Sequence, residues 1–167
     1  VNRMPLVEAI KGENTSDETV VKTVRIAKKL GKTPIVVKDV PGFCVNRILL
    51  PMMNEAVYLL QDGGEIEVID HALEVFGMPM GPFVLADVVG IDVGYKVAKI
   101  LEEGYGQRMK VARLLQEIHQ IYPDLLGKKS GTGFYNYVLG SKKPIVNPQI
   151  FEIMKKLRKD HAIPLYY

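Results

Sequence analysis

The residue whose type and position most suggest chemistry is Glu8. Its carboxylate stands in an extended apolar segment made of Leu6, Val7, Ala9 and Ile10. A buried carboxylate is costly unless it has a partner. Glu8 therefore lies either on an exposed strand edge or in a place where it is kept for proton handling, and its neighbours in the sequence leave both alternatives open.

The other reactive side chains are isolated in the sequence. His71, His119 and His161 are not spaced with a second histidine, a cysteine or a carboxylate as a metal site requires, so we expect surface or capping positions and no metal. Cys44 begins an apolar helical face, where packing is its ordinary role. One cysteine allows no internal disulfide, which favours the cytoplasm or an organelle matrix, peroxisomal or mitochondrial in a eukaryote.

A glycine-rich segment near the C-terminus looks superficially like a phosphate-binding loop. Its sequence is Lys128-Lys129-Ser130-Gly131-Thr132-Gly133-Phe134-Tyr135. No strand is predicted before it, and no Gly-Lys-Ser/Thr opens a helix after it, as nucleotide binding would need. The sequence predicts a tight turn instead, with the two aromatic residues anchoring it to the helices.

The first forty residues have the pattern strand, helix, strand. Extended segments are predicted over 4–10 and 34–40, and a helix over 16–30 with a capping box from Thr15 to Glu18 and Gly31 after its end. Two parallel strands alone are marginal in water, so this unit is expected to extend a larger sheet. We place a domain boundary after residue 40.

From Phe43 onward the sequence follows a helical period or is loop, and five or six helices are expected. The first runs from Val45 to Gly63, with Pro51 expected to kink it. The second covers 65–76. The remaining helix boundaries come from proline, glycine and capping residues: Pro82 opening a helix, Gly90 ending it, Asp92 capping the next, and Asn147 with Pro148 opening the last.

The bulk composition is that of a globular chain. With 167 residues, 47% of them apolar, it can bury one core or one core with a small appendage. No apolar run is long enough for a membrane span. A net charge of +3 is too small to predict nucleic-acid binding. The basic residues after 141 are read as a solvated face, with a rim for the phosphates of coenzyme A as the alternative.

Five methionines have two possible roles. They can fill gaps in the core, which is their usual use, or form a pliant surface for an acyl chain. These residues are Met52, Met53, Met78, Met80 and Met109.

Four blocks in order resemble the L-3-hydroxyacyl-CoA dehydrogenase family. The segment from Val1 to Glu8 is similar to the one that follows the family's His-Phe-Phe-Asn-Pro signature. The segment from Lys38 to Arg47 resembles its interdomain crossing. Gly77-Met78-Pro79-Met80-Gly81-Pro82-Phe83 with Asp87, Gly90 and Asp92, and then Gly131 to Tyr135, continue the likeness over nearly the whole chain.

The resemblance implies a mainly α fold. Residues 41–167 would form the helical C-terminal domain of the dehydrogenase, similar to that of 6-phosphogluconate dehydrogenase. This domain would contribute to substrate binding and to dimerisation. Residues 1–40 would be a residual β-α-β piece of a Rossmann-type NAD-binding domain. The chain continues past the Gly-Phe-Tyr segment through Pro144 to Pro148, which is more like the multifunctional β-oxidation α-subunit, where a hydratase precedes the dehydrogenase.

The implied activity is NAD-dependent oxidation of a (3S)-3-hydroxyacyl-CoA to the 3-oxoacyl-CoA. In the family a histidine takes the hydroxyl proton as hydride leaves C3, and a glutamate holds the imidazole; the matching glutamate is Glu8, the catalytic candidate. Asn46 matches an asparagine beside the substrate. The family histidine and the glycine-rich NAD loop are not among these residues, so we expect NAD to be bound by an N-terminal domain and the chain alone to be inactive.

Two other interpretations stay open. The chain could be a stand-alone helical oligomerisation module, or the C-terminal domain of another 6-phosphogluconate-dehydrogenase-like enzyme. In each case unpaired strand edges and apolar helices predict a homo-oligomer. An acyl-CoA partner is implied only by the dehydrogenase reading.

Overall fold

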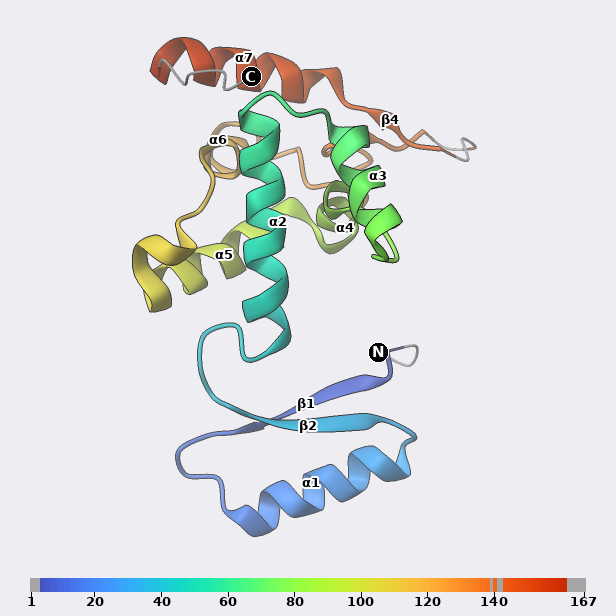
Figure 1. Cartoon of the computed structure of the whole chain (residues 1–167), viewed down its shortest axis with the longest axis vertical. Coiled ribbons are helices and arrows are strands. Elements are labelled where there is room, and N and C mark those ends of the chain that lie inside the picture. Colours follow the sequence, from blue (N-terminus) through green and yellow to red (C-terminus); the bar gives the residue numbers. More distant parts are fainter. Residues whose placement is uncertain (1–3, 139, 141–142, 162–167) are drawn as a thin grey trace. The chain divides into compact units, whose positions relative to one another are not determined.

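The computed structural model describes residues 4–138, 140 and 143–161, with side chains as far as 158. The chain divides into two compact units, Val1–Ile48 and Leu49–Tyr167. Figure 1 shows the elements of each. Helix α2 (Val45–Gln61) begins in the first unit and ends in the second.

The first unit is the predicted strand-helix-strand. Strand β1 (Leu6–Lys11) pairs in parallel with β2 (Thr33–Lys38), and α1 (Asp17–Lys29) connects them. In this register Glu8 lies opposite Ile35. The predicted cap at Thr15 is wrong by one residue. The Thr15 N–H bonds to the Gly12 carbonyl in a turn, which leaves Ser16 extended, and its Oγ accepts from the Thr19 N–H at 3.2 Å.

The second unit is a cluster of helices around one core (Figure 1). Six α-helices follow residue 44 in the described part of the chain, in agreement with the prediction. After α2 come α3 (Ile66–Phe76), α4 (Pro82–Val89), α5 (Ile91–Tyr105), α6 (Arg113–Ile121) and α7 (Pro148–His161), with a 3-10 turn η1 (Gly106–Met109).

The glycine-rich loop leads into a pair of short strands that the sequence did not predict. Strands β3 (Tyr135–Asn136) and β4 (Ile145–Val146) pair antiparallel, so the segment after Phe43 is not helix and loop alone. The Asn147 cap was predicted correctly, because its Oδ1 accepts the Gln149 N–H at 3.0 Å.

The predicted cap of α5 is also wrong. The helix begins at Ile91 with Gly90 as N-cap, and Asp92 lies in its first turn. The Gly90 N–H still bonds to the Ala86 carbonyl, which closes α4, and its φ of 102° turns the chain directly into α5. The Asp92 carboxylate instead receives the Lys129 ammonium at 2.5 Å.

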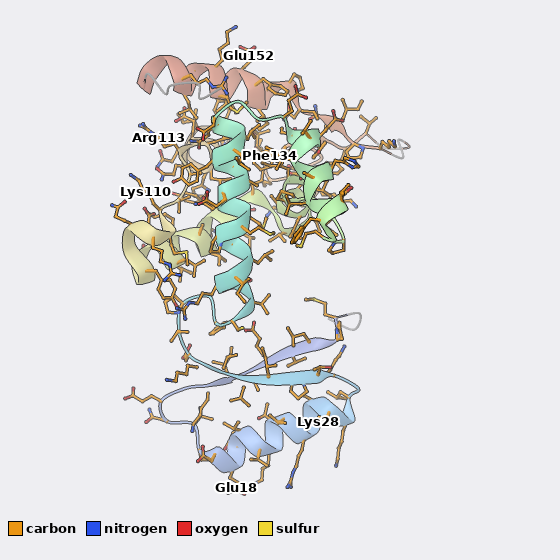
Figure 2. The ribbon with its side chains drawn as sticks, viewed as in Figure 1. Glu18, Lys28, Lys110, Arg113, Phe134 and Glu152 are labelled. Carbon is orange, nitrogen blue, oxygen red and sulfur yellow. The ribbon has the colours of Figure 1, made fainter. Side chains whose placement is uncertain are left out.

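The core of the second unit is built mainly from aliphatic side chains of α2, α3, α6 and α7. Phe83 and Phe134 pack within it, with ring centroids 4.8 Å apart. Figure 2 labels Phe134 among the side chains of this unit. No helix among the described residues is long and apolar enough to cross a membrane.

Candidate active-site residues and a buried carboxylate cluster

Glu8 is a half-buried side chain in the middle of β1 that caps a helix far away in sequence. Its Oε1 accepts the backbone N–H of Cys44 at 2.8 Å and that of Val45 at 3.2 Å. The first N–H groups of a helix have no partner inside the helix, and the positive end of the helix dipole favours an anion there. Glu8 therefore has a structural partner at the start of α2.

Both hydrogen bonds end on the same carboxylate oxygen. Within the described residues Oε2 of Glu8 accepts none. A carboxylate oxygen can accept more than one hydrogen bond, so Oε2 keeps its full accepting capacity while Oε1 fixes the position of the group. The arrangement suits a side chain that has to hold a donor in a defined direction.

A strained turn at residues 42–43 precedes the N–H groups of Cys44 and Val45 and orients them toward Glu8. Gly42 has a φ of 74°, and Phe43 is the one non-glycine residue with positive φ in the described chain, at 46°. Such a conformation costs on the order of 1–3 kcal/mol at a non-glycine residue and concentrates at functional sites. The Arg47 N–H, bonded to the Gly42 carbonyl, continues the helix after the turn.

Asn46 lies in the first turn of α2, directly after Val45. Its side chain is half-buried, and its amide makes no hydrogen bond within the described residues. Cys44 is half-buried rather than buried, so the packing role expected for it is only partly realised. Glu8 and Asn46 are thus both attached to the N-terminus of α2, one by hydrogen bonds and one by sequence.

A second polar cluster was not anticipated. Asp87 is 1% exposed and accepts the Phe134 N–H at 2.9 Å, the Tyr135 N–H at 2.9 Å and the Tyr137 hydroxyl at 3.0 Å. Asp70, 4% exposed, accepts the Phe83 N–H at 2.8 Å. The Tyr135 hydroxyl donates to Asp70 at 2.7 Å, so this one residue ties the loop to both α3 and α4.

Burial controls the ionisation of the cluster. Desolvation raises the pKa of Asp87 to about 6, against the lowering effect of its backbone donors at Phe134 and Tyr135 and of the Tyr137 hydroxyl. Desolvation also raises the pKa of Asp70. The Tyr135 pKa is raised by its own burial and by the Asp70 carboxylate that its hydroxyl faces.

Two glycines, Gly81 in the segment 77–83 and Gly133 in the glycine-rich loop, leave space for these carboxylates. A Cβ at Gly81 would overlap the Asp70 side chain, and a Cβ at Gly133 would overlap Asp87 Oδ1. The tight turn predicted for the loop is confirmed, with Phe134 and Tyr135 buried. A single aspartate in the otherwise apolar α4 is the same signal that singled out Glu8, and it could have identified Asp87 from the sequence.

Neither of the two histidines whose side chains are described, His71 and His119, belongs to a metal site. His71 is exposed, and His119 stacks on Tyr95 with ring centroids 4.2 Å apart. The side chain of His161 lies outside the described residues. In the part of the chain that the structure describes, no group of three or more histidine, cysteine, aspartate or glutamate side chains is placed to hold a metal ion.

Two family models match the sequence in succession. Residues 1–40 match the NAD binding domain, and residues 42–137 match the C-terminal domain, of 3-hydroxyacyl-CoA dehydrogenase. The chain belongs to the 3-hydroxyacyl-CoA dehydrogenase family. The fold expected from the resemblance, a helical C-terminal domain after a short piece of Rossmann type, is thereby confirmed.

Relatives and solved structures agree with this membership. The fatty acid oxidation complex subunit alpha of Shewanella loihica is 47% identical over 154 residues, covering 92% of this chain and 22% of that protein. The crystal structure of (S)-3-hydroxybutyryl-CoA dehydrogenase PaaH1 from Ralstonia eutropha is 40% identical with a TM-score of 0.77, covering 83% of this chain and 49% of that one. The Escherichia coli K12 3-hydroxybutyryl-CoA dehydrogenase structure is 34% identical, also with a TM-score of 0.77, over 86% and 31%. The chain spans about a fifth of the length of its curated relatives.

The family's NAD is not accommodated by the βα turn described here. A dinucleotide places its pyrophosphate on a helix N-terminus reached through a glycine-rich turn. The first turn of α1 carries Asp17 and Glu18, whose carboxylates repel phosphate. The described residues therefore hold no pyrophosphate site at this helix, although residues 1–40 match the NAD-binding domain of the family.

Proposed function

We propose that this chain supplies part of the substrate site of an NAD-dependent enzyme that oxidises a (3S)-3-hydroxyacyl-CoA to the 3-oxoacyl-CoA in fatty-acid oxidation. The supporting observation is that the two oxygens of the Glu8 carboxylate differ in their hydrogen bonds. Oε1 accepts the N–H groups at the N-terminus of α2, and Oε2 has no partner in the described residues. Family membership gives the reaction class.

Glu8 is proposed to position the family histidine. A neutral imidazole that accepts the substrate proton through one nitrogen carries a proton on the other, and a carboxylate oxygen bonded to that N–H fixes the tautomer and the ring plane. When the imidazole takes the proton, the same carboxylate faces a cation. Oε2 would make this bond, because Oε1 is already used by Cys44 and Val45.

Asn46 is proposed to bind the substrate. An amide offers both a donor and an acceptor, which suits the hydroxyl and thioester groups of a 3-hydroxyacyl thioester. Its position in the first turn of α2 links it to the same helix end that holds Glu8. Hydride goes to NAD in the family reaction, and no residue described here is assigned to that step.

A chimera tests the proposal. These residues replace the matching segment of the Shewanella loihica subunit alpha, and NADH formation from 3-hydroxybutyryl-CoA is followed. We expect turnover with the chimera, and none with the 167-residue chain alone because its sequence contains no Gly-x-Gly-x-x-Gly loop. Glu8→Gln should lower kcat roughly 10²–10⁴-fold, the usual range for lost acid–base assistance.

The matched control is Glu13→Gln, which removes an exposed carboxylate from the loop after β1. It should leave kcat unchanged. The glutamine at position 8 keeps an Oε1 that can cap α2 and loses only the attraction of the charge to the helix end, about 0.3–1 kcal/mol, so both variants should remain folded at the assay temperature. A folded chimera in which Glu8→Gln turns over within threefold of the parent refutes the role given to Glu8.

The larger protein is proposed to be a multifunctional α-subunit. The relatives at 46–51% identity bear the name fatty acid oxidation complex subunit alpha. One continuous reading frame that encodes a hydratase before residue 1 supports this proposal, and a separate dehydrogenase gene contradicts it. The compartment stays a prediction, which fractionation of the source cells tests.

Self-association is proposed through the outer face of α3. Val68, Val75 and Phe76 are 59%, 73% and 84% exposed, and with the exposed Ala72 they form one stripe at helical spacing. An apolar stripe of this kind marks an interaction site more often than a free surface. The alternative of a stand-alone oligomerisation module predicts the same stripe but no activity in the chimera.

A further inference from the structure

A cavity of about 220 Å³ lies in the second unit between α5, α6 and the segment that follows α6. Its floor is formed by Ile91, Ile118 and Leu125, which are at most 3% exposed. Leu126 and Pro123 add to the apolar wall. The cavity therefore has a buried apolar floor beneath an open mouth, unlike a shallow depression lined only by exposed side chains.

The polar side chains that line this cavity are Asp92, Tyr122 and two nitrogen donors. Lys96 and His119 line it, and neither the ammonium nor the imidazole makes a hydrogen bond within the described residues. Stacking on Tyr95 at 4.2 Å sets the plane of the His119 ring. The carboxylate of Asp92 also lines the cavity, but Lys129 neutralises it at 2.5 Å.

The resulting charge pattern favours one class of ligand. With Asp92 paired, the unpaired charge at the cavity is that of Lys96, next to a ring that can donate a hydrogen bond. An ammonium and a ring N–H together suit a carboxylate head, since charge-assisted hydrogen bonds are the stronger kind. The apolar floor suits a hydrocarbon tail and not a sugar or a nucleobase.

The volume limits the length of the tail. A cavity of this size equals roughly seven water molecules at about 30 Å³ each, and a methylene group occupies a similar space. We propose that the cavity between α5 and α6 binds the anion of a short-chain carboxylic acid of about six carbons, with the head at Lys96 and His119 and the tail on Ile91, Ile118 and Leu125. This site uses neither Glu8 nor Asn46.

The probe is hexanoate, titrated into the full chain while the Tyr95 and His119 ring resonances are followed by NMR. We expect a saturable shift with a Kd of about 1 mM, typical of a ligand of this size. Hexanol has the same tail without the charge and should bind at least tenfold more weakly. Acetate has the head without the tail and should show the same loss.

Two variants separate the site from general surface binding. Lys96→Gln removes the charge of an exposed side chain. It should raise the Kd for hexanoate about tenfold, which is the effect expected from the loss of one charge-assisted hydrogen bond. The control Lys110→Gln removes an exposed lysine outside the cavity and should leave the Kd unchanged. The proposal is overturned by the absence of saturation at 20-fold the expected Kd, by equal binding of hexanol, or by equal effects of the two lysine variants.

Discussion

Two glycine-to-alanine substitutions of opposite sign test the carboxylate cluster. Gly133 lies next to Asp87, where an added Cβ would overlap Oδ1 of the carboxylate. Gly94 lies in α5 with open space around the position of a Cβ. The same methyl group is therefore added once against a buried, hydrogen-bonded carboxylate and once to the free face of a helix.

The expected changes in the free energy of unfolding follow from these surroundings. Overpacking costs roughly 1–3 kcal/mol. Displacing Asp87 also weakens its bonds from the Phe134 and Tyr135 N–H groups, and hydrogen bonds to a charged group are worth about 1.5–3 kcal/mol each. Gly133→Ala should then lower the free energy of unfolding by about 3–5 kcal/mol. Gly94→Ala should raise it by about 0.5–1 kcal/mol, because alanine is the better helix former.

Urea denaturation of the parent and both variants, followed by circular dichroism at fixed pH, measures these differences. Unchanged slopes against urea concentration would show that the compactness of the two states is preserved. A decrease in the free energy of unfolding below 1 kcal/mol for Gly133→Ala, or a change of the same sign in the two variants, would refute the close packing of Gly133 against Asp87.

Three further expectations concern the same unit. Tyr135→Phe removes the hydroxyl that donates to Asp70 and should cost about 1.5–3 kcal/mol in urea denaturation; Tyr122→Phe, whose hydroxyl has no hydrogen bond in the described residues, is the control, and equal losses would refute the bond. The pKa of Asp87, raised to about 6, should appear as a midpoint near 6 in a carboxyl carbon NMR titration. Because the folded state keeps this proton while the unfolded chain loses it near 3.8, the contribution of Asp87 to stability should fall as pH rises from about 4 to 6, and a midpoint at or below 4 contradicts this. Phe76→Glu on the α3 stripe should shift the chain to a monomer in light scattering, whereas Glu67→Gln at the edge of the stripe should not, and an unchanged mass for Phe76→Glu would exclude α3 as the contact.

The sequence was sufficient for the features that depend on local periodicity and local capping. The parallel β1-α1-β2 unit, Pro82 at the start of α4 and the Asn147 cap all follow from residues close together in the chain. The two caps that were predicted wrongly, at Thr15 and Asp92, had suitable residue types. In each, a backbone hydrogen bond from a preceding turn or helix decided which residue became the cap.

Contacts between residues far apart in the chain could not be predicted from the sequence patterns. Nothing local to Glu8 indicates that its carboxylate caps a helix 36 residues later. The bond from Tyr135 to Asp70 spans 65 residues. The resemblance supplied Glu8 and Asn46 as candidates, and the structure adds what surrounds them; their roles in catalysis and substrate binding stay predictions.

The central claim is that Oε2 of Glu8 holds the histidine that takes the substrate proton. The pH dependence of kcat/KM in the chimera tests it most directly, because a carboxylate beside an imidazole raises the imidazole pKa. Glu8→Gln should move the acidic limb of the profile down by about one pH unit or more, with α2 still capped. An acidic limb that stays in place, with kcat/KM unchanged at its plateau, would contradict the account.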